Sequence, residues 1–422
     1  MNYKDCQEWK KVGFPLSTTS NEAAKMYDAV VTQYMSGYSD DSVGDIGTCL
    51  QKMFMADPEF VLGHAVKNGL MLLAGGTSVR TNMDLQNDID KMVTMAQKAD
   101  ITPLEKLHVE AVKLYSVGQS ALASDKWEEI LLYYPTDVLA VQNAFIAHLF
   151  SGRSYQMRDC FARVLPHWEV LPPSTLKSNI RSLYAFGLEE SNFYDEAEKL
   201  AKENHFLSGH IYWHWGLFHI ERGEYEVALT LYDEQLMDRE KIIDLIDASS
   251  FLYRLELEGV NVGDRWKAVH KRWSPRIGDH AVMFDDIHSF MATQGAEQDG
   301  VAANFIESLR DFVNNADDRN DNARVSKEVG LPLCEAFKAY GNGDYGTAVD
   351  IMTPIRYRIQ EIGGSHAQRD IFNLFLIHAA LKSSEQKHQL LARSLLQERQ
   401  ARRKCSPMTD RILAQLGDIS NN

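Results

Sequence analysis

The chain has 422 residues, and 45% of them are hydrophobic, which is enough for a large core or for a continuous array of helical repeats. It carries 44 Lys and Arg residues and 59 Asp and Glu residues, so its formal net charge at pH 7 is −15. This acidic balance argues against a general binder of nucleic acids or membrane surfaces, because both functions need basic faces. It suits partners that are neutral, basic or small.

The cysteines indicate a reducing compartment. There are five, they lie far apart and none forms a CxxC pair, so we expect neither a disulfide framework nor a cysteine-rich zinc site. The first residues contain no apolar segment like that of a secretory signal. No apolar run approaches the roughly 18 residues that a membrane span needs. These features predict a cytoplasmic protein without a membrane partner.

Helix start and stop signals divide the first hundred residues into helices. A capping box at residues 19–22, with Thr19 as the cap, predicts a helix that continues to Met35. A second helix is expected over residues 40–55. Asp57 is expected to be the N-cap of a third helix, which begins at the proline that follows it. These segments are spaced like helix pairs but match no repeat pattern well.

Four later segments match the tetratricopeptide repeat, a helix pair of about 34 residues in which small residues mark the closest helix crossing. The matches cover residues 104–137, 178–208, 209–242 and 329–362. The third is the clearest: Gly216 and Ala228 occupy the two positions that need a small residue. Aromatic residues, Tyr225 and Tyr232, fill the neighbouring positions, and Gly223 forms the turn between the helices.

The remaining sequence also has the pattern of helices. We expect them over residues 157–165, 240–258, 264–272, 280–293, 301–314, 367–382 and 387–403. Pro166 should end the first of these, and residues 315–322 form a polar loop. No segment alternates as a strand does. The predicted fold is therefore all-α: one right-handed solenoid of tetratricopeptide-repeat-like helix pairs spanning residues 1–422.

Several stretches are shared with a known family. They are DCQ at residues 5–7 with Trp9, PLSTTSNE at 15–22, NFYDEAEKLAKE at 192–203, YWHW at 212–215, GEY at 223–225, GLPLC at 330–334, PIRYRI at 354–359 and GGSHAQRD at 363–370. Through them the chain resembles the tetratricopeptide repeat protein 38 family over nearly its whole length. The resemblance implies an intracellular helical-repeat protein and brings no established activity. The resemblance also implies a difference. Just after Glu203, members of the family have roughly one additional helix pair, rich in histidine, which this chain lacks.

Three histidines fall on the first helix of the clearest repeat. His210 and His214 are four residues apart, so they share a face and could bind one metal ion. The nearest acidic residue, Glu221, lies ~10 Å along the helix axis from His214, too far to share that ion. We therefore expect no metal and no other cofactor, and we expect the rings, including that of His219, to stack or hydrogen-bond beside Trp213.

The same helix carries more aromatic and imidazole groups than one buried face can hold. Two Trp, one Tyr and three His residues occur between residues 210 and 219. Such groups are poor choices for a merely solvated face, because each exposes apolar area and still needs a hydrogen-bond partner. Trp213 and His214 are therefore candidates for ligand binding at an inner surface, unless a neighbouring helix covers them.

Two further segments supply candidate residues. Asp285 and His288 are three residues apart on a predicted helix, so the carboxylate could orient the imidazole as a general base requires, although such pairs are also common as structural contacts. Gln368, Arg369 and Asp370 begin a helix after two glycines, where backbone amides and the guanidinium could hold an anion. Alternatively, the aspartate favours the helix N-terminus electrostatically and the arginine pairs with a neighbour.

Two functions remain open. No GxSxG, P-loop, GxGxxG or CxxC motif occurs, so the sequence gives more support to a non-enzymatic role. We expect a scaffold that binds a peptide or protein on its concave surface, through an open groove with Lys, Arg and Asn side chains. The alternative is a protein or enzyme that binds a small molecule in a pocket lined by His and aromatic groups, where His214, His288 and Arg369 converge.

Overall fold

The computed structural model describes residues 3–98, 100–191, 193, 196, 208–239, 241–402 and 405–419, and every regular element in these ranges is helical. The only β pairing there is an isolated bridge between Asp40 and Gly44. The all-α prediction is confirmed, whereas the repeat type stays a prediction. The chain divides into two compact units, Met1–Leu207 with Arg319–Asp321, and Ser208–Asp318 with Asn322–Asn422.

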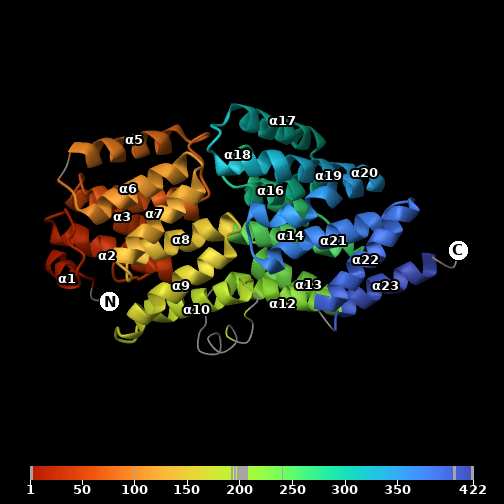
Figure 1. Ribbon diagram of the computed structural model, residues 1–422, viewed down its shortest axis with the longest axis horizontal. Coiled ribbons are helices and arrows are strands. Elements are labelled where there is room, and N and C mark those ends of the chain that lie inside the picture. The colour runs from red at the N-terminus through yellow and green to blue at the C-terminus, as the bar shows by residue number, and fades with distance from the viewer. Residues whose placement is uncertain are drawn as a thin grey trace. The chain divides into compact units, whose positions relative to one another are not determined.

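In the first unit, helices that are neighbours in sequence pack against each other, such as α2 on α3, α6 on α7, and α9 on α10 (Figure 1). The elements are α1 (Cys6–Lys11), α2 (Asn21–Ser36), α3 (Ile46–Ala56), α4 (Val61–Gly69), the π-helical turn η1 (Leu70–Ala74), α5 (Met83–Lys98), α6 (Pro103–Ser116), α7 (Ser120–Tyr133), α8 (Val138–Phe150), α9 (Ser154–Glu169) and α10 (Thr175–Glu190). This order of packing is compatible with a helical solenoid.

The second unit begins with α12 (Ser208–Arg222), α13 (Tyr225–Leu231), the π-helical turn η2 (Tyr232–Leu236), α14 (Ile242–Leu257), α15 (Arg265–Trp273), η3 (Ser274–Arg276), α16 (Met283–Gly295) and α17 (Asp299–Asn315). It continues with α18 (Asp321–Val325), η4 (Ser326–Gly330), α19 (Leu331–Gly341), α20 (Tyr345–Ile355), η5 (Arg356–Ile362), α21 (His366–Lys382), α22 (Gln386–Arg402) and α23 (Pro407–Ile419). Helix α14 contacts α12, α15, α16 and α21, and nearly all of its side chains are buried (Figure 1).

Two predicted N-caps are wrong: another side chain caps α2, and no side chain caps α4. Ser20, not Thr19, is the N-cap of α2. Asp57 ends α3, and its carboxylate accepts a hydrogen bond from Thr18 at 2.5 Å. It therefore does not cap α4, which begins at Val61. The capping residues were identified as N-terminal signals, but tertiary contacts decide which of them caps a helix.

Three other boundaries also differ. The helix predicted from residue 40 begins at Ile46, because residues 40–44 form a turn and the carboxylate of Asp45 caps the backbone. Helix α9 continues three residues past Pro166, since a proline near the end of a helix breaks few hydrogen bonds. His280 lies before α16 with a φ of 46°, so it is not on the same helix as His288.

The small residues of the third repeat match lie at close contacts. A Cβ atom on Gly216 would lie 2.3 Å from the ring of Phe251 in α14 and 3.2 Å from Leu231 in α13. Ala228 is fully buried. In the second match, residues 178–208, the first part up to residue 191 is described, and most positions from 192 to 207 lie outside the described residues. No helix in the described ranges is both long enough and apolar enough to span a membrane.

Candidate functional site

Helix α12 presents a cluster of rings to α14. Trp213 is fully buried, and its indole Nε1 donates to the Ser250 hydroxyl at 3.2 Å. The His210 ring is stacked on Trp213, with centroids 5.1 Å apart and planes at 12°. His214 stands edge-on to both rings, at 4.6 Å and 4.8 Å. Three ring residues therefore share one side of α12, as their spacing along the helix requires.

A buried carboxylate joins this cluster to a second helix. Asp247 of α14 is 1% exposed; its Oδ2 lies 2.8 Å from His210 Nδ1, and its Oδ1 accepts from Gln368 Nε2 at 3.2 Å. The second nitrogen of His210, Nε2, is 3.2 Å from Nε2 of His214. A chain of polar contacts therefore runs from α21 through α14 to α12 and ends at His214, which is exposed.

The surroundings of His214 keep its imidazole neutral. Packing of protein atoms around the ring, followed by the neighbouring His210, lowers its pKa to about 4. The charge of Arg254 also lowers this pKa, whereas the carboxylate of Asp247 opposes the shift. The ordinary pKa of histidine is near 6.5, so at neutral pH His214 is an uncharged imidazole with one ring N–H.

Arg254 is a buried cation that the sequence analysis did not single out. It lies one turn of α14 beyond Ser250, donates to the backbone oxygens of Ser250 at 3.1 Å and Ala367 at 2.7 Å, and stands 5.4 Å over the Trp213 ring. These contacts connect α14 with the first turn of α21. The guanidinium of Arg254 thus donates to backbone carbonyl groups, whereas the carboxylate of Asp247 accepts from the side chains of His210 and Gln368.

Gln368 has a structural role in this network. Its side-chain Oε1 accepts from the backbone N–H of Ser365 at 3.0 Å, and its backbone N–H donates to the Ser365 hydroxyl at 3.2 Å. Together these two bonds form a capping box. Its side-chain nitrogen is the donor to Asp247. Gln368 therefore positions the start of α21 relative to α14 rather than presenting a free group.

The two candidates on α16 do not act on each other. His288 is fully buried, and its Nδ1 donates to the Phe284 carbonyl at 2.7 Å, so a backbone group rather than Asp285 orients the ring. Its Nε2 has no hydrogen-bond partner within the described ranges. Burial lowers the pKa of His288 to about 4. For Asp285, burial and the adjacent Asp286 raise the pKa to about 8.

The other two residues at the start of α21 have separate partners. Arg369 donates to the carbonyl oxygen of Gly364. Asp370 accepts two hydrogen bonds from Arg399 of α22, at 2.6 Å and 2.8 Å. The structural alternative assigned the aspartate to the helix N-terminus, whereas Asp370 pairs with a side chain of another helix. The contacts of Arg369 lie at the glycine turn, whereas those of His214 lie at His210 and Trp213.

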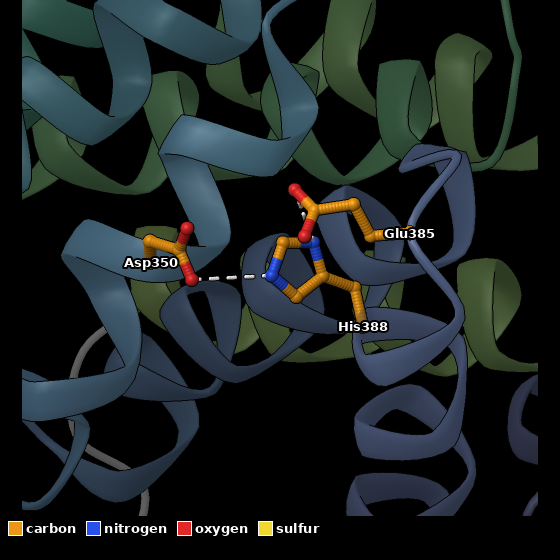
Figure 2. A group of neighbouring side chains, drawn as sticks. All are labelled: Asp350, Glu385 and His388. Carbon is orange, nitrogen blue, oxygen red and sulfur yellow. Dashed lines mark hydrogen bonds and ion pairs between the residues drawn. The ribbon is translucent and has the colours of Figure 1, made fainter.

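A second group of metal-ligand types lies between α20 and α22. Asp350, Glu385 and His388 each bring a ligand atom within 4.8 Å of the others, and Figure 2 shows the two carboxylates beside different edges of the imidazole. Nε2 of His388 lies 3.2 Å from Asp350, and Nδ1 lies 2.8 Å from the Ser383 hydroxyl.

The positive charge beside these two carboxylates comes from a lysine side chain. The Lys387 ammonium is 3.1 Å from Asp350 and 3.3 Å from Glu385. Since the carboxylates face different ring nitrogens and share an ammonium, the contacts are satisfied without a metal ion. The sequence analysis did not identify this group, because Asp350 is distant in sequence from the other two residues.

No protein-family model matches this chain. The resemblance to the tetratricopeptide repeat protein 38 family therefore stays a prediction. Trp213 and His214 lie against the ring of His210, which contacts Asp247, and Gln368 donates to the same carboxylate. The other candidates, Asp285, Arg369 and Asp370, make separate local contacts.

Proposed function

We propose that the chain is a helical-repeat scaffold of the tetratricopeptide type, related to the tetratricopeptide repeat protein 38 family, that binds a peptide segment of a protein partner. The observation that carries the proposal is an exposed aromatic face on α12. The side chains of Trp215 and Phe218 are 52% and 53% exposed. Large aromatic groups at a surface are typical anchors of protein interfaces, because they bury much apolar area with few rotatable bonds.

This aromatic face is ordered before any partner binds. Tyr212 is stacked with Trp215, with centroids 6.4 Å apart, and the His219 ring lies 5.8 Å from Trp215. Arg222 stands 5.4 Å over the Phe218 ring. Preorganised side chains lose little conformational entropy on binding, which favours affinity. We define the aromatic face as Tyr212, Trp215, Phe218 and His219.

The charge of the chain specifies the chemistry of the partner. With a net charge of −15, the protein attracts basic segments and repels acidic ones. An apolar side chain that packs on Trp215 and Phe218, flanked by Lys or Arg residues, would use both properties. The free state of all five cysteines agrees with a cytoplasmic location for this partner and for the protein.

The test is selection of peptides from a displayed random library on the full chain, followed by affinity measurement with the enriched peptides. We expect apolar-basic peptides whose affinity falls at least tenfold for Trp215→Ala and Phe218→Ala, while the melting temperature changes little because both side chains are exposed. Tyr357→Ala is the matched control, since Tyr357 is an exposed aromatic residue of the same unit outside this face. Enriched peptides that bind both variants as tightly as the parent would contradict the proposal.

A further inference from the structure

We propose that His210 and His214 form a binding site for a divalent transition-metal ion of the zinc class. The observation is the approach of two imidazole nitrogens: Nε2 of His210 lies 3.2 Å from Nε2 of His214. Both rings belong to α12, and His214 is an exposed residue, so an ion can reach it from solvent. This site is independent of the aromatic face and does not depend on peptide binding.

The separation of the two nitrogens fits tetrahedral coordination. Zinc binds imidazole nitrogen at about 2.0–2.1 Å, so two nitrogens on one tetrahedral ion are about 3.3–3.4 Å apart. The observed separation of 3.2 Å needs only a small adjustment to reach that value. Histidines one helical turn apart are a recurrent arrangement for such an ion, because they project from the same face.

Asp247 supplies the supporting contact that metal-binding histidines need. Its carboxylate lies 2.8 Å from Nδ1 of His210, so that nitrogen carries the proton and donates it, and the lone pair of Nε2 is directed toward His214. The carboxylate cannot turn away easily, because it is buried and Gln368 donates to its other oxygen. This support increases the basicity of the His210 ligand and fixes its orientation.

The second ligand is placed by the same helix face. The His214 ring stands edge-on to the His210 ring, with centroids 4.6 Å apart and planes at 84°. The nearby charge of Arg254 opposes binding, but that guanidinium is held by backbone carbonyls of Ser250 and Ala367, and the Asp247 carboxylate offsets it.

The sequence predicts no metal, because Glu221 is too distant to share the ion. In the structure Glu221 accepts a hydrogen bond from the Ser406 hydroxyl at 2.5 Å. The carboxylate that supports the proposed site is that of Asp247, which is 37 residues from His210 in sequence. It would contact Nδ1 of the His210 ligand and would not bind the ion itself. With two imidazoles from the protein, water completes the coordination, so we infer an exchangeable ion rather than a permanent structural one.

The test uses the full chain, stripped with a chelator and titrated with Zn²⁺ at pH 7.5 by calorimetry, and with Co²⁺ by visible absorption. We expect one Zn²⁺ per chain and the absorption bands of tetrahedral cobalt. His214→Ala should weaken Zn²⁺ binding at least tenfold, and Asp247→Asn should weaken it about tenfold or more by removing the supporting carboxylate. Because Asp247 is buried, circular dichroism must first show that this variant is folded.

Two matched variants test the location of the ion. His219→Ala removes another histidine of α12, whose Nδ1 is paired with Glu224 at 2.7 Å, and His388→Ala removes the imidazole of the Asp350–Glu385–His388 group. Both should bind Zn²⁺ like the parent chain. Absence of stoichiometric binding, binding that His214→Ala leaves unchanged, or binding that His388→Ala abolishes would each overturn the proposal.

Discussion

Gly216 is the residue at which the packing of the second unit can be tested most directly. An alanine there would place its Cβ atom 2.3 Å and 2.7 Å from two ring carbons of Phe251, whereas carbon atoms in contact are normally about 3.5–4.0 Å apart. The ring cannot move away freely. It is fully buried and is stacked on the buried ring of Tyr232, with centroids 5.7 Å apart.

The expected cost of Gly216→Ala is the difference between two effects. Overpacking of a buried site costs about 1–3 kcal/mol. Replacing a glycine inside a helix with alanine returns about 0.5–1 kcal/mol of the free energy of folding. The two ranges leave a net loss of about 0–2.5 kcal/mol, and the 2.3 Å approach to a buried ring places Gly216→Ala in the upper half of that range. For a cooperative unit of roughly 200 residues, each kcal/mol lowers the melting temperature by about 2–4 °C.

Differential scanning calorimetry of the full chain measures this loss, with Gly300→Ala as the control. Gly300 also lies in a helix, α17, but a Cβ atom built on it meets nothing within 4 Å. The control should therefore melt at the same temperature as the parent or slightly higher. If Gly216→Ala melts like Gly300→Ala, the close approach of α12 and α14 at Gly216 is wrong.

The remaining predictions concern two ionisable groups, the Asp370–Arg399 pair and Asp285. Asp370→Ala should cost about 3–5 kcal/mol in chemical denaturation, because it leaves the buried Arg399 without the carboxylate that accepts its two hydrogen bonds. The double variant Asp370→Ala/Arg399→Leu should recover most of that loss, and a double variant as unstable as the single one would contradict this. For Asp285, the pKa in the folded state is raised to about 8, so the folded chain retains a proton that the unfolded chain loses above pH 4. The stability of the parent should therefore fall, relative to that of Asp285→Asn, as the pH rises from about 4 to 8; equal pH dependence of the two melting temperatures would refute this.

The helical architecture could be predicted because its signals are local. The capping box that begins α6, for example, is formed by Thr102 and Glu105, residues three positions apart in sequence. The same reasoning failed at Asp57. Its carboxylate accepts a hydrogen bond from the hydroxyl of Thr18, which is 39 positions away. The amino acids around residue 57 give no sign of this contact.

The candidate site was predictable only in part, for the same physical reason. The shared face of Trp213 and His214 follows from helical geometry. The importance of Asp247 does not, because its partners His210 and Gln368 are 37 and 121 residues away. One local signal is present: polar residues at positions 247, 250 and 254 follow a spacing of three and four, so they share one face of α14.

These polar groups bear on both functions that we propose for α12. A buried carboxylate and a buried guanidinium are costly unless every partner is in place, so only one arrangement of α12, α14 and α21 satisfies Asp247 and Arg254 together. That arrangement fixes the rotation of α12 about its own axis. It therefore also determines that Trp215 and Phe218 are directed outward. Changes to the inner side of α12 should disturb folding, metal binding and the aromatic face together, whereas changes to Trp215 or Phe218 should affect peptide binding alone.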